Sequence, residues 1–175
     1  MHGVVFQQLF KFIRENHGTQ TLDDICNASG INFRLYNSMK SYPDQEIENI
    51  LKEVCARLNI SRDAALETFG EYIGPALIKM YGAYIKKEWG ALDLLENIES
   101  TIHRTVRMNN PEATPPALKI ERTSEKEVVI KYSSERKMIH LGIGIIKSVS
   151  KHYNIPLNIK KSMGVGQQIL TITSV

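Results

Sequence analysis

The segment VVIKYSSER, residues 128–136, joins a run of strand-forming residues to three polar side chains at alternate positions, Tyr132, Ser134 and Arg136. In extended backbone, residues two apart point the same way, so these side chains are expected to line one edge at intervals of roughly 7 Å. All three can donate hydrogen bonds, and a guanidinium group matches the geometry of a carboxylate or a phosphate. The segment therefore predicts a site for a molecule with two or more neighbouring anionic oxygens, unless it is an ordinary polar strand end.

Further strands are expected on either side of this segment, because the hydrophobic pattern changes from a helical to a twofold period after Pro115-Pro116. The strands are predicted at residues 118–122, 128–132, 157–161 and 168–173, with one long helix at about 136–153. Gly164 and Gly166 lie between the last two strands and favour a hairpin there. The C-terminal part therefore predicts an antiparallel sheet with helices.

The residues before Pro115 show helical periodicity instead. The predicted helices cover residues 1–17, 22–30, a segment capped by Asp44, a segment capped by Ser61 that breaks or kinks at Gly74-Pro75 and continues to about Lys87, and residues 91–108. The fold class is therefore expected to be α+β. A helical N-terminal lobe would precede a C-terminal lobe that contains a four-stranded antiparallel sheet.

His103 lies on the predicted 91–108 helix, at the margin of its apolar face. On a wheel of 100° per residue it falls about 20° from Leu92, a member of the apolar stripe. A neutral imidazole is the commonest protein ligand to a metal and the usual proximal ligand of heme iron. A lone histidine is otherwise most often a satisfied core or surface group. Combined with the 132–136 segment, His103 suits a heme, whose propionates would bind the polar side chains.

The composition is that of one soluble domain. The chain has 175 residues, of which 42% are hydrophobic and 23% charged. Its net charge of +3 is too small to indicate nucleic-acid binding. Neither a transmembrane helix nor a secretion signal is visible, so a cytoplasmic location is expected. Cys26 and Cys55 have no neighbours at metal-ligand spacing, which argues against a cysteine-based zinc site.

Landmarks along most of the chain resemble the heme-nitric oxide/oxygen binding family, the H-NOX domains related to the sensor region of soluble guanylate cyclase. The matching residues are Met1-His2-Gly3-Val4-Val5, Tyr42-Pro43-Asp44, Phe69-Gly70, Leu94-Leu95-Glu96-Asn97-Ile98 before His103, Pro115-Pro116, and Tyr132, Ser134 and Arg136. The resemblance implies one domain over residues 1–175. It would consist of a helical distal subdomain to about residue 85 and an α+β proximal subdomain from about residue 86, with heme buried between them.

The resemblance also implies roles for individual residues. His103 would bind the iron of a b-type heme held without covalent attachment, since the chain has no Cys-x-x-Cys-His sequence. Tyr132, Ser134 and Arg136 would hold the propionates, Pro116 would press on the porphyrin and distort it, and Leu118 would contact it. The expected distal pocket consists of Val5, Leu9, Ile73, Leu77, Leu141 and Ile145.

The distal position is the basis for predicting which gas is bound. Oxygen-binding members resemble one another in having a distal tyrosine five residues after the arginine, where this chain has Leu141. Without that hydrogen-bond donor, the resemblance implies a sensor for nitric oxide, and also carbon monoxide, that binds oxygen poorly. His140 precedes Leu141 and should point about 100° away from it, although a kink could turn it inward.

Signalling is expected to pass to another protein, since no phosphate-cradling glycine loop or Ser/His/Asp arrangement indicates an enzyme. The resemblance implies release of His103 when nitric oxide binds, relaxation of the heme, and regulation of a bacterial histidine kinase or of a diguanylate cyclase or phosphodiesterase. One alternative is an oxygen sensor with His140, Tyr72, Tyr81 or Tyr84 as donor. The other is a heme-free domain that binds peptides or anions, while a peroxidase is a more distant possibility.

Overall fold

The computed structural model describes residues 1–38 and 40–175. The helices are α1 (Gly3–His17), α2 (Thr19–Ala28), α3 (Asp44–Leu58), α4 (Arg62–Met80), α5 (Ala91–Asn97), α6 (Arg104–Asn109) and α7 (Ile139–Tyr153). Short 3-10 turns η1 (Phe33–Leu35) and η2 (Gly82–Tyr84) and a π-helical segment η3 (Ile98–His103) complete the helical elements. The strands are β1 (Ala117–Ser124), β2 (Glu127–Ser133), β3 (Leu157–Gly164) and β4 (Gln167–Ser174).

The four strands form one antiparallel sheet in the order β1-β2-β4-β3. All four lie within three residues of their predicted bounds, and the α+β fold class is confirmed. In β2, Val128, Ile130 and Tyr132 are buried while the residues between them are partly exposed, as the twofold period requires. The buried face packs against α5 and α7, so Tyr132 is the last member of an otherwise apolar row that faces the core.

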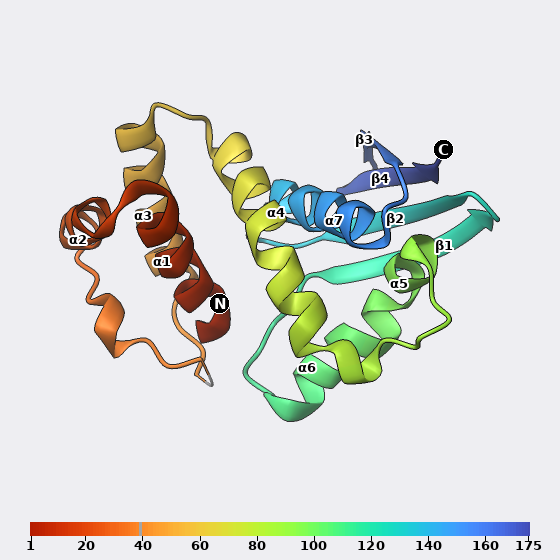
Figure 1. Ribbon diagram of the computed structural model, residues 1–175, viewed down its shortest axis with the longest axis horizontal. Coiled ribbons are helices and arrows are strands. Elements are labelled where there is room, and N and C mark those ends of the chain that lie inside the picture. The colour runs from red at the N-terminus through yellow and green to blue at the C-terminus, as the bar shows by residue number, and fades with distance from the viewer. Residues whose placement is uncertain (39) are drawn as a thin grey trace.

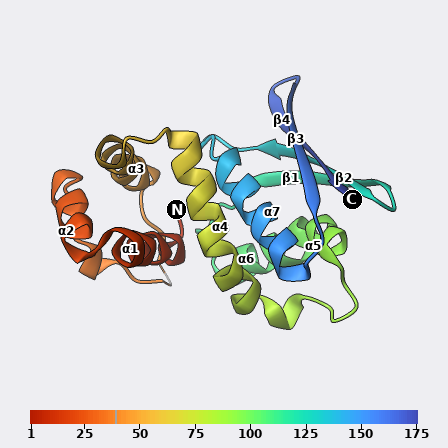
Figure 2. The ribbon, with the colours of Figure 1, turned by 45° about the horizontal axis from the view of Figure 1, so that its top comes forward.

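The helices α1, α2 and α3 are grouped on one side of the molecule and the sheet lies on the other, with α4 between them (Figures 1 and 2). Two clusters of buried side chains match this arrangement. The first contains residues of α1–α4 together with Met138, and the second contains residues of α5, α7 and the sheet. Because Leu141 and Ile145 of α7 pack against the first cluster and Ile143 belongs to the second, α7 contacts both.

Close packing between α4 and α7 depends on glycine. A β-carbon at Gly70 would lie 2.3 Å from the carbonyl oxygen of Leu141, and one at Gly144 would lie 2.1 Å from that of Glu67. One turn further along, a β-carbon at Gly74 would clash with the side chain of Ser148. The sequence predicted a break or kink at Gly74-Pro75 and a continuation to about Lys87; α4 continues past Pro75 without a break and ends at Met80. Proline removes one hydrogen bond from the helix, and we attribute the tolerance of that loss to the contact with α7.

Asp44 does not cap α3, although the sequence predicted that it would. Pro43 occupies the N-cap position and Asp44 is the first helical residue. Its carboxylate is instead committed to the Met1 ammonium group and to Arg136, at 2.7 Å each. Ser61, by contrast, caps α4 as predicted and accepts a hydrogen bond from the Ala64 amide at 3.2 Å. Within the described residues, no helix is long and apolar enough to cross a bilayer.

Candidate functional site

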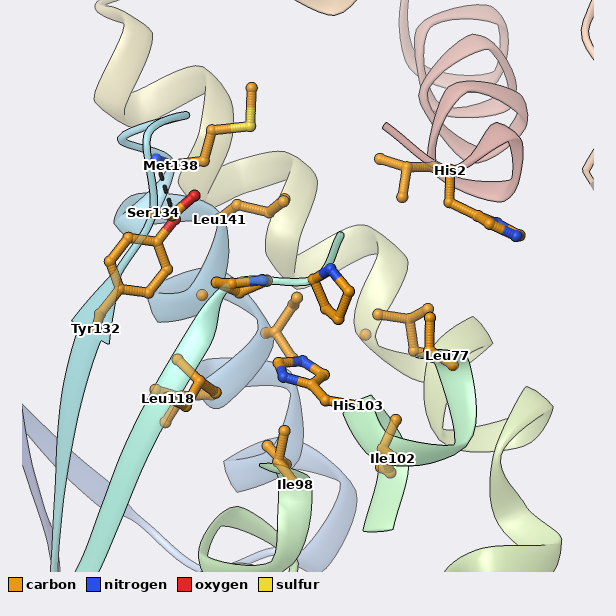
Figure 3. Close-up of a pocket in the computed structure, with 18 of the residues that line it drawn as sticks. His2, Leu77, Ile98, Ile102, His103, Leu118, Tyr132, Ser134, Met138 and Leu141 are labelled. Carbon is orange, nitrogen blue, oxygen red and sulfur yellow. Dashed lines mark hydrogen bonds between the residues drawn. The ribbon is translucent and has the colours of Figure 1, made fainter. Parts of the chain in front are cut away.

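A cavity of about 280 Å³ lies where α1, the second half of α4, η3, α6, β1, β2 and α7 meet. Most of its lining is aliphatic, including Leu77, Ile98 and Leu118, and this composition suits an apolar ligand. In Figure 3, His103 lies between Leu118 and Leu77, with Ile98 and Ile102 beneath it and Leu141 above. The cavity therefore combines apolar walls with an imidazole.

The π-helical segment η3 determines where His103 is placed. The sequence predicted one uninterrupted α-helix over residues 91–108, but the six residues from Ile98 to His103 form a wider turn between α5 and α6. Such turns inside helices are rare and frequently occur at functional sites. The His103 side chain is 16% exposed. Burial lowers the pKa of His103 below its ordinary value, which favours the neutral form that binds metals.

His103 also contacts Glu99, which the sequence reasoning did not single out. The Nδ1 atom of His103 lies 2.8 Å from Oε2 of Glu99, while Oε1 of Glu99 accepts a hydrogen bond from Arg107 at 2.7 Å. Hydrogen bonds with Glu99 and with the backbone of Pro116 oppose the effect of burial on the pKa of His103 without reversing it. The spacing of four residues between Glu99 and His103 was a usable signal, because side chains at that spacing are neighbours on a helix.

Tyr132, Ser134 and Arg136 all line the cavity, but they do not form a row along one strand. Strand β2 ends at Ser133, and the chain then turns through Lys137, whose φ of 50° lies in the left-handed region. The Tyr132 hydroxyl accepts a hydrogen bond from the Met138 amide at 3.3 Å, and the Ser134 hydroxyl accepts one from the Arg136 amide at 3.3 Å. The turn, not strand periodicity, brings the three groups together.

Arg136 makes several hydrogen bonds at the edge of the cavity. Its side chain is 14% exposed, donates to the Asp44 carboxylate at 2.7 Å, and donates to the backbone carbonyl and the hydroxyl of Thr114. Burial alone would raise the pKa of Asp44, but hydrogen bonds from the Met1 ammonium and from Arg136 outweigh it and lower the pKa. Arg136 thus already binds a carboxylate next to an apolar cavity, so the residues present fit a group with an apolar body and acidic substituents, such as heme.

The other predicted contacts are divided between the cavity and the core. Pro116, Leu118, Val5, Leu77, Leu141 and Ile145 line the cavity. Leu9 and Ile73 are not part of that lining, and their place in the distal pocket stays a prediction. Each is 1% exposed and packs inside the N-terminal core cluster, because both side chains point toward the helices of that lobe.

The residues considered as hydrogen-bond donors to a bound gas, His140 and three tyrosines, lie in different parts of the structure. His140 is absent from the cavity lining: its Nδ1 lies 3.3 Å from Oε2 of Glu67, and its Nε2 lies 2.7 Å from Nζ of Lys161. Tyr72 bonds to Glu15, and Tyr84 is 45% exposed. Tyr81, however, lines the cavity, and burial raises its pKa. Tyr81 is therefore the candidate donor that the structure favours among the alternatives.

His2 is a second histidine of the cavity lining and was not among the predicted site residues. Its Nδ1 accepts a weak hydrogen bond from the Val4 amide at 3.4 Å and thereby caps α1. Figure 3 shows its ring on the opposite side of the view from Tyr132 and Ser134. Within the described residues, no group of three or more His, Cys, Asp or Glu side chains could hold a metal ion.

Comparisons with known proteins agree with this geometry. A family model described as Haem-NO-binding matches residues 2–161. An H-NOX protein from S. oneidensis, crystallised in the Fe(II)NO state, superposes with a TM-score of 0.92 at 21% identity, covering 100% of this chain and 99% of that one.

The unliganded Fe(II) H-NOX protein from K. algicida gives a TM-score of 0.91 at 23% identity and covers 100% of this chain and 97% of its own. A point mutant of the H-NOX protein from T. tengcongensis gives 0.87 at 18% identity, with 99% and 97% covered. A search among curated proteins found no match.

Proposed function

The chain belongs to the Haem-NO-binding family, and on this premise we propose that it is a heme-based sensor for nitric oxide. The observation that carries the proposal is that one apolar cavity combines the His103 imidazole with the Arg136 guanidinium, which already holds a carboxylate. A metal ligand inside the cavity and an anion-binding group lining it are the two contacts that a heme requires. A peptide-binding domain would need no imidazole there.

Each polar residue has a distinct task in this proposal. His103 binds the iron through Nε2, because its Nδ1 is occupied by Glu99. Arg136, Ser134 and Tyr132 bind the propionates, while Pro116 and Leu118 contact the ring of a non-covalent b-type heme. When bound, the heme supplies an iron atom that can take a diatomic gas. The 175 residues act as one domain, with distal and proximal subdomains that meet near residue 85.

Selectivity for nitric oxide follows from the apolar distal wall. Val5, Leu77, Leu141 and Ile145 offer no hydrogen bond to a bound gas. Bound oxygen carries negative charge and needs a donor, whereas nitric oxide and carbon monoxide need little such help. The residues therefore favour the latter two gases. An oxygen sensor is the second candidate function, and the specific observation in its favour is that Tyr81 lines the cavity.

Heme would supply the site where nitric oxide binds, and the signal would be the release of His103 that follows. His103 and the helical segment η3–α6 would then shift, and the shift would reach the N-terminal lobe through the shared cavity wall. Because nitric oxide favours one of two states, it can change the affinity for a partner. We propose a cytoplasmic signalling role without catalysis, directed to a histidine kinase or to a diguanylate cyclase or phosphodiesterase.

The proposed function is tested by absorption spectroscopy of the purified protein reconstituted with hemin. The reduced protein should show the Soret band of a five-coordinate ferrous heme, and nitric oxide should shift that band. Air should oxidise the reduced protein without a stable oxygenated form. A colourless protein that takes up no hemin would contradict heme binding, and a stable oxygenated spectrum would favour the second candidate.

Arg136→Gln is expected to accelerate heme loss more than Ser134→Ala. A hydrogen bond to a charged group contributes about 1.5–3 kcal/mol and a neutral one about 1 kcal/mol, so the expected increases are roughly 10- to 100-fold and about 5-fold. The measurement is the rate of heme transfer to excess apomyoglobin. Arg57→Gln is the matched control, since Arg57 pairs with Asp24 away from the cavity. Equal rates for Arg136→Gln and this control would contradict the propionate assignment.

A further inference from the structure

Glu99 contacts the Nδ1 side of the His103 ring, which leaves Nε2 as the nitrogen that would bind a metal. Its Oε2 lies 2.8 Å from Nδ1 of His103, and the two side chains are 29% and 16% exposed. Arg107 lies 2.7 Å from the other carboxylate oxygen and therefore fixes the orientation of the carboxylate. The three residues come from η3 and α6, so the turn that positions His103 also positions its neighbour.

The chemistry of this contact determines which ring nitrogen carries the proton. A carboxylate can accept but not donate a hydrogen bond, so Nδ1 of neutral His103 must be the donor. The Pro116 backbone also acts to raise the pKa of His103, but it is a neutral acceptor, and a hydrogen bond to a charged acceptor is roughly twice as strong. The proton is then on Nδ1 and Nε2 keeps its lone pair. A histidine ligand that donates its other N–H to a carboxylate is fixed in one tautomer and becomes a more basic ligand.

We infer that Glu99 is a positioning residue that holds His103 as the Nδ1–H tautomer and strengthens the bond from Nε2 to the heme iron. The inference rests on the proposed function of His103 and extends it. Since the signal is the release of His103, a stronger bond raises the threshold for that release. Glu99 therefore sets how much of the nitric oxide-bound protein keeps His103 on the iron.

A simpler role for Glu99 is to stabilise the helix. A partly exposed pair four residues apart usually contributes well under 1 kcal/mol, and its loss would change stability without changing the tautomer. The two roles are therefore separated by observing the His103 ring itself. Glu99→Leu removes the acceptor, Glu99→Gln keeps an acceptor but removes the charge, and Glu96→Gln removes a charge from α5, where Glu96 pairs with Arg122 instead.

The first measurement needs no heme. In the apoprotein, ¹⁵N chemical shifts of the His103 ring should report a proton on Nδ1 in the wild type and in Glu96→Gln. In Glu99→Leu the proton should redistribute toward Nε2. A wild-type ring protonated on Nε2, or an unchanged tautomer in Glu99→Leu, would overturn the inference.

The second measurement uses the reduced heme protein. The iron–histidine stretching frequency in resonance Raman spectra should fall from wild type to Glu99→Gln and further to Glu99→Leu, and heme affinity should fall about 10-fold in Glu99→Leu. The fraction of five-coordinate nitrosyl heme should rise in the same order. If Glu99→Leu and Glu96→Gln both take up heme and show the same iron–histidine stretching frequency, the inference about Glu99 is contradicted but the proposed function is not. A wild-type protein that takes up no heme contradicts the proposed function itself.

Discussion

His103→Gly is expected to abolish heme binding, and added imidazole is expected to restore it. The variant removes the proposed iron ligand and leaves empty the space that the His103 side chain occupied. A free imidazole can fill that space, because its walls are formed by other residues such as Ile98, Ile102 and Leu118. Without imidazole, the propionate contacts and apolar contact alone are not expected to retain heme. The measurement is the ferrous absorption spectrum after hemin reconstitution, recorded with and without millimolar imidazole.

The control for this variant must reproduce its effect on helix stability. Glycine costs about 1 kcal/mol in a helix, so His152→Gly, in the exposed last turn of α7, serves as the match. It should bind heme as the wild type does. Normal heme retention by His103→Gly without imidazole would show that another histidine binds the iron. His2 would be the first to examine, because it also lines the cavity.

The strands could be predicted from the sequence because burial of one face of a sheet makes hydrophobic and polar residues alternate along each strand. Val128, Ile130 and Tyr132 alternate with partly exposed residues, and the structure buries those three. Helices with a single apolar stripe were equally readable. The sequence left a break and a kink at Pro75 both open, because the tolerance of a proline inside α4 depends on α7, about seventy residues further along the chain.

The candidate site was predicted less completely than the fold. His103, Arg136 and Leu141 could be named from the sequence, and all three line one cavity. The partners of Arg136 could not, because Asp44 and Thr114 are 92 and 22 residues away from it and no local pattern connects them. The sequence also could not show that Leu9 and Ile73 pack in the N-terminal core, since a helical stripe does not reveal which of its members face a cavity and which face the core.

Leu141→Tyr is expected to give the protein a stable complex with oxygen, which the wild type should lack. Leu141 faces the cavity from α7, so a tyrosine there would direct its hydroxyl into existing space and donate to a bound gas. A hydrogen bond to a charged acceptor contributes about 1.5–3 kcal/mol, which corresponds to a gain in oxygen affinity of roughly 10- to 100-fold. Affinity for carbon monoxide should change much less, because that ligand gains little from a donor.

Leu141→Phe separates the hydroxyl from the size of the ring, because it differs from the tyrosine variant in that one group. It should bind oxygen as poorly as the wild type, and flash photolysis under oxygen and carbon monoxide measures both affinities. Stable oxygen binding by the wild type would contradict nitric oxide selectivity, and its loss in Tyr81→Phe would then identify Tyr81 as the donor. The remaining outcome is that neither Leu141→Tyr nor Tyr81→Phe changes the affinity for oxygen. Leu141 would then not lie on the gas-binding side of the heme, and the distal wall would have to be assigned to the other side.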